Sequence, residues 1–367
     1  MAKNVALFFD GTWQVPDMDL EDGDTNTNVS RLYQAVADNP MAEGGTVKRY
    51  YHGVGSDLHW YDRLVAGATG LGLSEILVEA YVELVELLRP EDRLFLFGFS
   101  RGAYTARSLS GMLHTSGLLH PEHRQLAGRA YALYRDRRRG PQSAEARRFA
   151  SRYAWVPEIH MIGVWDTVGS LGIPLRSFAA FNRRRFEFHD TRLSPLVRHA
   201  YQALAIDEHR KAFAPTLWSP QTTTATLEQV WFPGAHSNVG GGYRDRVLSD
   251  VSLDWMMGRA CEQGLPLLPD SRPLLGSPPS EDDIVDSYQR FLSRLYRLIS
   301  PRRYLRRIGF ASFGNETLHP SVATRRLALP GYRPAIHLDT DSPRVRARAP
   351  ATDTTTPTRK EWALSVA

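Results

Sequence analysis

The amino-acid sequence predicts an α/β fold, with a mostly parallel sheet that carries helices on both faces. Short apolar runs recur at residues 5–9, 94–99 and 159–165, and runs of this kind are typical of strands buried on both faces of a parallel sheet. Residues 73–88 have the periodicity of an amphipathic helix and lead directly into the second run. Strands and helices that alternate in this way indicate βαβ units.

The composition is that of an ordinary globular protein, and it excludes several kinds of site. Of the 367 residues, 42% are hydrophobic and 23% are charged, which is the usual balance for a soluble domain. The single cysteine, Cys261, rules out an intrachain disulfide and a cysteine-based zinc cluster. No apolar run reaches the roughly 18 residues that span a bilayer or forms the core of a secretory signal. We therefore expect a cytoplasmic protein without cofactor or metal, for which signal-independent secretion is possible.

The net charge of +5 comes from local runs of arginine. A basic chain can bind nucleic acid, but these runs lack the interleaved aromatic residues of single-strand binders, and no nucleic-acid-binding motif is present. We expect no nucleic-acid partner, and the sequence leaves the oligomeric state open.

The first strand, residues 5–9, is followed by a loop that begins Asp10-Gly11-Thr12. Glycine permits close backbone approach, so Gly11 or Thr12 could direct an N–H at a neighbouring site. A helix over residues 29–36 and a second strand over 47–51 come next, before the amphipathic helix that precedes the strand at 94–99.

The strand at 94–99 ends in the sequence Gly98-Phe99-Ser100-Arg101-Gly102. This G-x-S-x-G pattern between a strand and a helix is typical of a nucleophile elbow, in which a serine sits on a strained turn. The alternative is an ordinary turn in which Ser100 caps the helix. A serine hydroxyl is a poor nucleophile on its own, so the catalytic interpretation requires a histidine base and a carboxylate that orients it.

Candidates for both groups follow later strands. Asp166 comes directly after the strand at 159–165, and His236 lies on a glycine-rich loop after a strand at 228–232. Ligands of open α/β sheets gather beyond the carboxyl ends of the strands. The chain order Ser100, Asp166, His236 is also that of an α/β-hydrolase triad.

Other carboxylates compete for the role of the acid. Asp250 follows His236 by fourteen residues and is the main alternative. Asp207 and Asp254 fall within helical patterns and are weaker candidates.

We expect one domain over residues 1–339, with helical or lid insertions at about 121–155, 173–200 and 265–310. Residues 340–367 are rich in Thr, Pro and Arg and are expected to be disordered. Residues 290–299 form a basic amphipathic pattern. Such a helix either packs on the core with a solvated arginine face or makes peripheral contact with an anionic membrane. An alternative function follows, in which the fold is a membrane- or partner-binding module and Ser100 is incidental.

Six motifs together resemble one family. They are FFDGTW at 8–13, TNVSRL at 27–32, GFSRGAYTAR at 98–107, GVWDTVG at 163–169, FPGAHSNVGGGY at 232–243 and LSDVSLDWM at 248–256. The chain is similar to the uncharacterised-domain α/β hydrolases that include the lipase effectors of type VI secretion, which are bacterial phospholipases. The resemblance implies an α/β-hydrolase-like core, phospholipase A-type ester cleavage, and no metal in the triad. It also implies Ser100 as nucleophile, Asp166 as acid and His236 as base.

The expected reaction is cleavage of a carboxylic ester, such as a lipid, through an acyl-enzyme. His236 would accept the Ser100 proton while Asp166 holds the imidazole. The oxyanion would be bound by the backbone N–H of Arg101 and a second N–H from Gly11 or Thr12. Acyl length, head group and regiospecificity are not indicated by the sequence.

Overall fold

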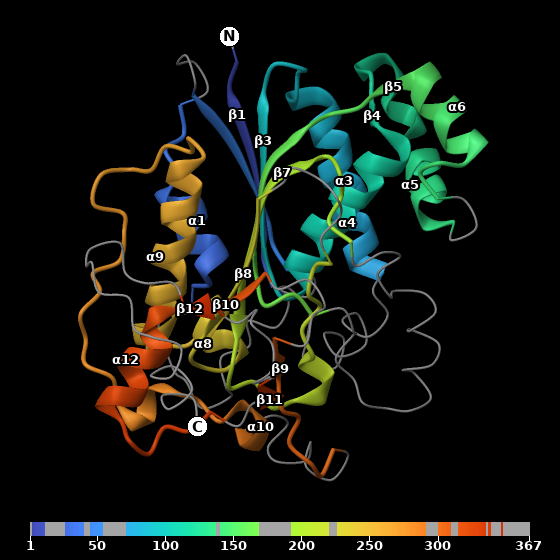
Figure 1. Ribbon diagram of the computed structural model, residues 1–367. Helices are drawn as coiled ribbons and strands as arrows, with labels where there is room; N and C mark the ends of the chain where they lie inside the picture. The colour runs from blue at the N-terminus through green and yellow to red at the C-terminus, as the bar shows by residue number, and fades with distance from the viewer. Residues whose placement is uncertain are drawn as a thin grey trace.

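The computed structural model is built around one parallel sheet (Figure 1). It describes residues 2–11, 26–39, 45–53, 71–136, 140–168, 192–219, 226–290, 300–309, 315–334, 337–338 and 346–347. Within these residues the sheet has eight strands in the order β12-β10-β8-β7-β6-β3-β1-β2, and every neighbouring pair is parallel. The strands are β1 (Asn4–Phe9), β2 (Thr46–Tyr51), β3 (Arg93–Phe99), β6 (Ile159–Trp165), β7 (Val197–Ala205), β8 (Thr226–Phe232), β10 (Glu316–Leu318) and β12 (Arg346–Ala347).

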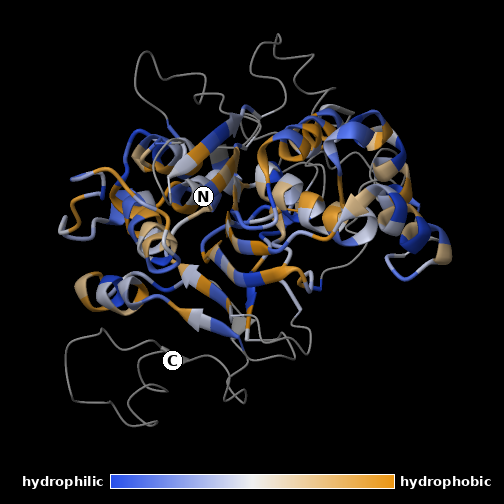
Figure 2. Cartoon of the chain, turned by 90° about the horizontal axis from the view of Figure 1, so that it is seen from above, coloured by the Kyte–Doolittle hydropathy of each residue, from blue (hydrophilic) through white to orange (hydrophobic). Residues whose placement is uncertain are grey.

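Helices cover both faces of the sheet, as the view from above also shows (Figure 2). They are α1 (Asn28–Ala35), α3 (Leu71–Leu87), α4 (Arg101–Ser116), α5 (Ala127–Arg135), α6 (Ala144–Tyr153), α8 (His236–Gly240), α9 (Val247–Glu262), α10 (Ser287–Arg290) and α12 (Pro320–Ala328). Two small sheets pair β4 (Leu118–Leu119) with β5 (Ala154–Trp155), and β9 (Arg307–Ile308) with β11 (His337–Leu338). This is the α/β-hydrolase-like architecture that the sequence predicts.

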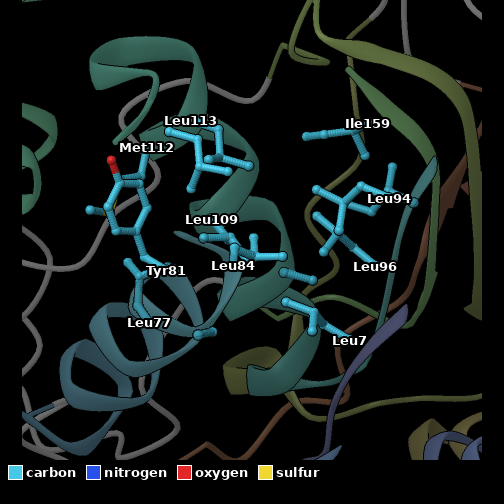
Figure 3. Packing of buried hydrophobic residues seen from close by; sticks show 14 of the residues in the cluster. Leu7, Leu77, Tyr81, Leu84, Leu94, Leu96, Leu109, Met112, Leu113 and Ile159 are labelled. Carbon is cyan, nitrogen blue, oxygen red and sulfur yellow. The ribbon is translucent and has the colours of Figure 1, made fainter. Parts of the chain in front are cut away.

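Strand β1 shows why both faces are covered. Its side chains alternate, and all of them are buried. Val5, Leu7 and Phe9 pack in a cluster with the apolar sides of α3 and α4, part of which Figure 3 shows. Ala6 and Phe8 pack on the other face with α1 and α9. A strand that is apolar at every position from Val5 to Phe9 is stable only where both faces are removed from water.

The expected strands and helices up to residue 165 are confirmed, with boundaries that differ by a few residues, but β7 was missed. Its first residues fall in the range 173–200, which the sequence assigned to an insertion. Arg198, His199 and Gln202 interrupt its apolar pattern. Gln202 is nevertheless buried, and its amide donates to the carbonyl oxygen of Thr216 at 3.2 Å. Asp207 follows this strand and does not lie in a helix, contrary to the sequence interpretation.

The C-terminal third also differs from expectation. Strand β10 extends the sheet beyond β8, and in the tail expected to be disordered Arg346–Ala347 form β12 beside β10. The described parts of 265–310 contain only short helical turns and β9, whereas the described parts of 121–155 are helical over most of their length, as expected. Residues 291–299 of the basic amphipathic pattern, residues 173–191 of the proposed lid and the rest of the tail lie outside the described residues. Among the helices described, none combines the length and the apolar character needed to cross a membrane.

The turn between β3 and α4 depends on two glycines. A Cβ atom on Gly98 would lie 2.6 Å from the carbonyl carbon of Gly102. A Cβ atom on Gly102 would lie 2.0 Å from the carbonyl oxygen of Phe9 and 2.6 Å from that of Asp10. The start of α4 therefore packs directly on the main chain at the end of β1, an approach that only glycine permits.

We expect Gly102→Ala to destabilise the protein by about 2 to 3 kcal/mol, because the added methyl group meets main-chain atoms that cannot move aside. Urea unfolding monitored by circular dichroism measures this loss. Gly128→Ala in α5 is the matched control, since a Cβ atom there has nothing within 4 Å. It should leave the free energy of unfolding unchanged or slightly higher. Equal stability of the two variants would contradict the close-approach argument.

Candidate active site

The carboxyl ends of β3, β6 and β8 bring Ser100, Asp166 and His236 to one edge of the sheet, the lower edge in Figure 1, where α8 lies. Strands β3 and β6 are neighbours, and Phe99 pairs in register with Trp165. The N–H of Ser100 continues this pairing by donating to the carbonyl oxygen of Trp165 at 3.0 Å. Ser100 and Asp166 therefore leave adjacent strands side by side.

The position within the sheet is also one where ligands bind. The chain passes from β1 to β2 on one side and then crosses to β3 on the other, so the strand order changes direction between β1 and β3. Open α/β sheets bind their ligands at such a point, beyond the carboxyl ends of the strands. Ser100 follows β3 and Gly11 follows β1, so both lie at this point.

Ser100 occupies a strained backbone conformation. Its φ is 56° and its ψ is −116°, a region that residues with a side chain rarely adopt. Ser100 precedes α4, but its hydroxyl does not cap the helix, so the capping alternative is wrong. The side chain is nearly buried, with 6% of the residue exposed. The strain holds this side chain on a sharp turn at the end of a buried strand, as a nucleophile elbow requires.

Asp166 and His236 form a direct, buried hydrogen bond. Nδ1 of His236 lies 2.6 Å from Oδ2 of Asp166, and both side chains are almost entirely removed from water. Asp166 also has a positive φ, of 37°, and its Oδ1 accepts the N–H of Ala205 at 3.2 Å. The carboxylate can therefore hold the proton of the imidazole on Nδ1, which leaves Nε2 to act as a base.

Two aromatic rings pack against the imidazole of His236. The ring centroids of Phe99 and Phe213 lie 4.6 Å and 5.0 Å from that of His236. Phe99 is the residue before Ser100, so the imidazole packs against the turn that carries Ser100. A Cβ atom on Gly240 would lie 2.0 Å from the Phe99 ring, which explains a glycine at this position. His236 begins the short helix α8 and does not lie in an irregular loop as expected.

The structure distinguishes the two candidate acids by position. Asp250 lies in the first turn of α9 and forms an ion pair with Arg31 of α1 at 2.5 Å. The carboxylate that meets His236 is that of Asp166.

A contact that sequence reasoning missed is made by Arg306. Its Nη1 and Nη2 lie 3.0 Å from Oδ1 and Oδ2 of Asp166, and both side chains are fully buried. Burial raises the pKa of the Asp166 carboxyl, but the Arg306 guanidinium and the hydrogen bond with His236 outweigh it and hold that pKa below its usual value. In the sequence Arg306 is one residue in a run of arginines, and nothing local separates it from its exposed neighbours.

The residues expected to donate hydrogen bonds to the oxyanion are Arg101, Gly11 and Thr12, and the structure shows a different situation for each. Arg101 is the first residue of α4, directly after Ser100. The N–H of Gly11 donates to Oδ1 of Asp10 at 2.6 Å, so it is engaged within its own loop. Thr12 lies outside the described residues. For Gly11 to bind the oxyanion, its N–H must therefore release the Asp10 carboxylate and donate to the substrate oxygen instead.

Asp10 organises the loop after β1. Its Oδ2 accepts the hydroxyl of Thr27 at 2.7 Å and the hydroxyl of Tyr50. Burial raises the pKa of Asp10, and the hydrogen bonds from Tyr50, Thr27 and Gly11 counter part of that rise. Because Gly102 packs on the carbonyl oxygens of Phe9 and Asp10, this loop is held next to the turn that carries Ser100.

Asn28, which the sequence motifs include but do not single out, ties three helices together. It is fully buried, and its amide donates at 2.9 Å to the carbonyl oxygens of Val239 in α8 and Ser249 in α9. The only sequence signal is its place in the TNVSRL motif.

The described residues contain no group of three or more His, Cys, Asp or Glu side chains that could hold a metal ion.

Known proteins share the sequence pattern of this chain. Residues 3–259 match the family described as the catalytic domain of Tle1-like phospholipase effectors of type VI secretion. An uncharacterized protein of Saccharomyces cerevisiae is 27% identical over 240 residues, which cover 59% of this chain and 33% of the yeast protein.

Two solved structures are similar to this chain, at a lower sequence identity. One is a Tle1 effector bound to the VgrG spike of the type 6 secretion system, with 20% identity, a TM-score of 0.39, and coverage of 66% of this chain and 51% of that chain. The other is an uncharacterized protein from Pseudomonas aeruginosa, with 20% identity, a TM-score of 0.42, and coverage of 82% and 51%. The chain thus spans about half the length of these structures and a third of the yeast protein.

Proposed function

Because the chain belongs to the family of Tle1-like phospholipase effector catalytic domains, we propose that it is a serine hydrolase that cleaves carboxylic esters of lipids. The observation that carries the proposal is the buried hydrogen bond between Asp166 and His236, at the sheet edge where Ser100 sits on a strained turn. Acyl transfer through a serine requires a nucleophile, a base and an acid at one place, and the parallel strands of this sheet carry candidates for all three to the same edge.

The proposed reaction begins when Oγ of Ser100 attacks the ester carbonyl carbon while Nε2 of His236 accepts the hydroxyl proton. Asp166 keeps the other imidazole proton on Nδ1 and stabilises the imidazolium that forms. The tetrahedral intermediate then expels the alcohol, which takes the proton from His236. An acyl-enzyme on Ser100 remains. Water attacks it, again with His236 as base, and releases the carboxylic acid.

The negative oxygen of the tetrahedral intermediate needs donors that are already in place. We assign the first to the backbone N–H of Arg101, because the residue after the nucleophile has this role in elbows of this type. The second would come from Gly11 or Thr12, in the loop held against the elbow by Gly102. A donor of this kind contributes on the order of 10² to 10³ in rate.

The substrate class rests on the family. Phospholipase effectors hydrolyse lipid esters, so we propose a phospholipid or a related lipid as the substrate. Peripheral contact with an anionic membrane would bring the enzyme to such a substrate.

A fluorophosphonate probe tests the proposed nucleophile without knowledge of the substrate. We expect it to label the protein once, on the peptide that contains Ser100, because a serine activated by a neighbouring base attacks phosphorus as it attacks a carbonyl. Tandem mass spectrometry identifies the site, and heat-denatured protein is the control that should not react. Labelling elsewhere, or equal labelling after denaturation, would contradict the proposal.

Phosphatidylglycerol and phosphatidylcholine vesicles, compared with short-chain p-nitrophenyl esters, then distinguish a phospholipase from a general esterase.

A further inference from the structure

We propose that Arg306 is a positioning residue of this site, whose guanidinium keeps the Asp166 carboxylate ionised and oriented toward His236. The inference rests on the proposed serine hydrolase function and deepens it. Arg306 lies outside residues 3–259, which match the family, so the proposal adds a residue from the C-terminal part of this chain to the site.

The contact has the geometry of a specific pair. Both terminal nitrogens of Arg306 lie 3.0 Å from the two carboxylate oxygens of Asp166. A paired contact of this kind fixes the plane of the carboxylate as well as its charge. Oδ2, which meets the imidazole of His236 at 2.6 Å, is one of the two oxygens held.

Arg306 is itself held in place on two sides. Its Nη2 also donates to the carbonyl oxygen of Phe213 at 2.9 Å, and its Nε donates to that of Glu208 at 3.4 Å. The Phe213 ring packs on the imidazole of His236. Arg306 therefore contacts both the Asp166 carboxylate, which meets the imidazole, and the main chain of Phe213, whose ring packs against the imidazole.

The charges around His236 form two buried pairs. One is Asp166 with Arg306, and the other is Glu208 with Arg210, whose Nε and Nη2 each lie 2.8 Å from a carboxylate oxygen. Glu208 also accepts the backbone N–H of His236 at 3.3 Å. Arg210 makes a paired contact with Glu208, and Arg306 makes one with Asp166; the Arg306 charge also lowers the pKa of Glu208.

The chemical role follows from the burial of Asp166. Burial raises the pKa of a carboxyl group, and the opposing influence of the Arg306 charge and the His236 hydrogen bond keeps the pKa of Asp166 low. A protonated Asp166 could no longer hold the imidazole proton on Nδ1. Loss of the Arg306 charge would let the hydrogen-bonded Asp166–His236 pair take up a proton at higher pH, and would therefore move the acid side of the pH–activity profile to higher pH.

Two variants test this, Arg306→Met and Arg306→Lys. We expect the acid limb of the kcat/KM profile for a p-nitrophenyl ester to move up by roughly 1 to 3 pH units in the methionine variant. The lysine variant, which restores the charge without the paired geometry, should move less. At a fixed pH below the displaced limb, kcat/KM should fall about tenfold for every pH unit by which the limb has moved. Arg303→Met is the matched control, because Arg303 belongs to the same segment and pairs with Asp286 at the surface. Its profile should match that of the wild type.

A second readout needs no substrate. The proton on Nδ1 of His236, shared with Asp166, can be followed by ¹H NMR as the pH is lowered. We expect the chemical shift of this proton to change at a higher pH in Arg306→Met than in the wild type, because the Asp166–His236 pair takes up a proton sooner as the pH falls. Thermal unfolding shows which variants are folded, and if the methionine variant fails to fold, Arg306→Gln, which also removes the charge, carries the test.

An unchanged acid limb in a folded variant without the Arg306 charge, together with an unchanged midpoint for the shift of the Nδ1 proton, would overturn the proposal. A displacement of either, absent from Arg303→Met, would support it. A wild-type protein that neither turns over esters nor reacts with the fluorophosphonate would refute the proposed hydrolase function. The NMR titration would still decide whether Arg306 keeps Asp166 ionised.

Discussion

Ser100→Ala is expected to reduce the turnover of p-nitrophenyl esters by about 10⁶-fold, the scale of loss when the nucleophile of a serine hydrolase is removed. The fold should survive. Alanine keeps the Cβ atom that serine already carries at φ 56°, and the serine hydroxyl does not cap α4. Initial rates, compared with the same protein concentration of wild type, measure the loss.

The control is Ser151→Ala, which removes an exposed hydroxyl from α6. Its rate and its melting temperature should equal those of the wild type. If Ser100→Ala unfolds at the wild-type temperature yet retains most of the ester turnover, the assignment of the nucleophile is wrong.

Asp166→Asn should lower kcat by about 10⁴-fold, because an asparagine amide cannot keep the imidazole in the tautomer that accepts the serine proton. The reference is Asp250→Asn, the variant of the other candidate acid. Asp250 pairs with Arg31, away from the carboxylate that meets His236, so its loss should change the rate little. Steady-state kinetics of the two variants decide the acid, and a greater loss at Asp250 would overturn the choice of Asp166.

Folding has to be separated from catalysis in this test. Asp166→Asn leaves the buried Arg306 without its carboxylate, and an uncompensated buried charge costs roughly 3–5 kcal/mol. The double variant Asp166→Asn with Arg306→Met removes both charges together. It should recover stability relative to the single variant and remain inactive. Recovery of activity along with stability would mean that Asp166 is structural.

Much of the fold could be predicted because its elements have strong local patterns. The buried strands β1, β3 and β6 are almost uninterrupted apolar runs, and the approach of α4 to β1 is reflected in Gly98 and Gly102. Strand β7 could not be predicted in this way. Its apolar pattern is broken by Gln202, whose burial is acceptable only because Thr216 lies close enough to accept its hydrogen bond.

The candidate site could likewise be predicted only in part. That Ser100, Asp166 and His236 each follow a strand is visible in the sequence, because a strand and the turn after it involve neighbouring residues. Which carboxylate meets the histidine is not visible, since Asp166 and Asp250 are both plausible from their positions in the chain.

By itself the sequence determined the α/β class, the strand–turn–helix segment around Ser100 and the set of residues that could form a site. The tertiary structure decided that Asp166 and not Asp250 meets His236, 70 residues away, and that Arg306, 140 residues away, balances its charge. The physical reason is that a buried charge is stable only beside an opposite charge or a hydrogen-bond donor. That partner is set by how the strands and loops pack together, and no pattern of neighbouring residues specifies it.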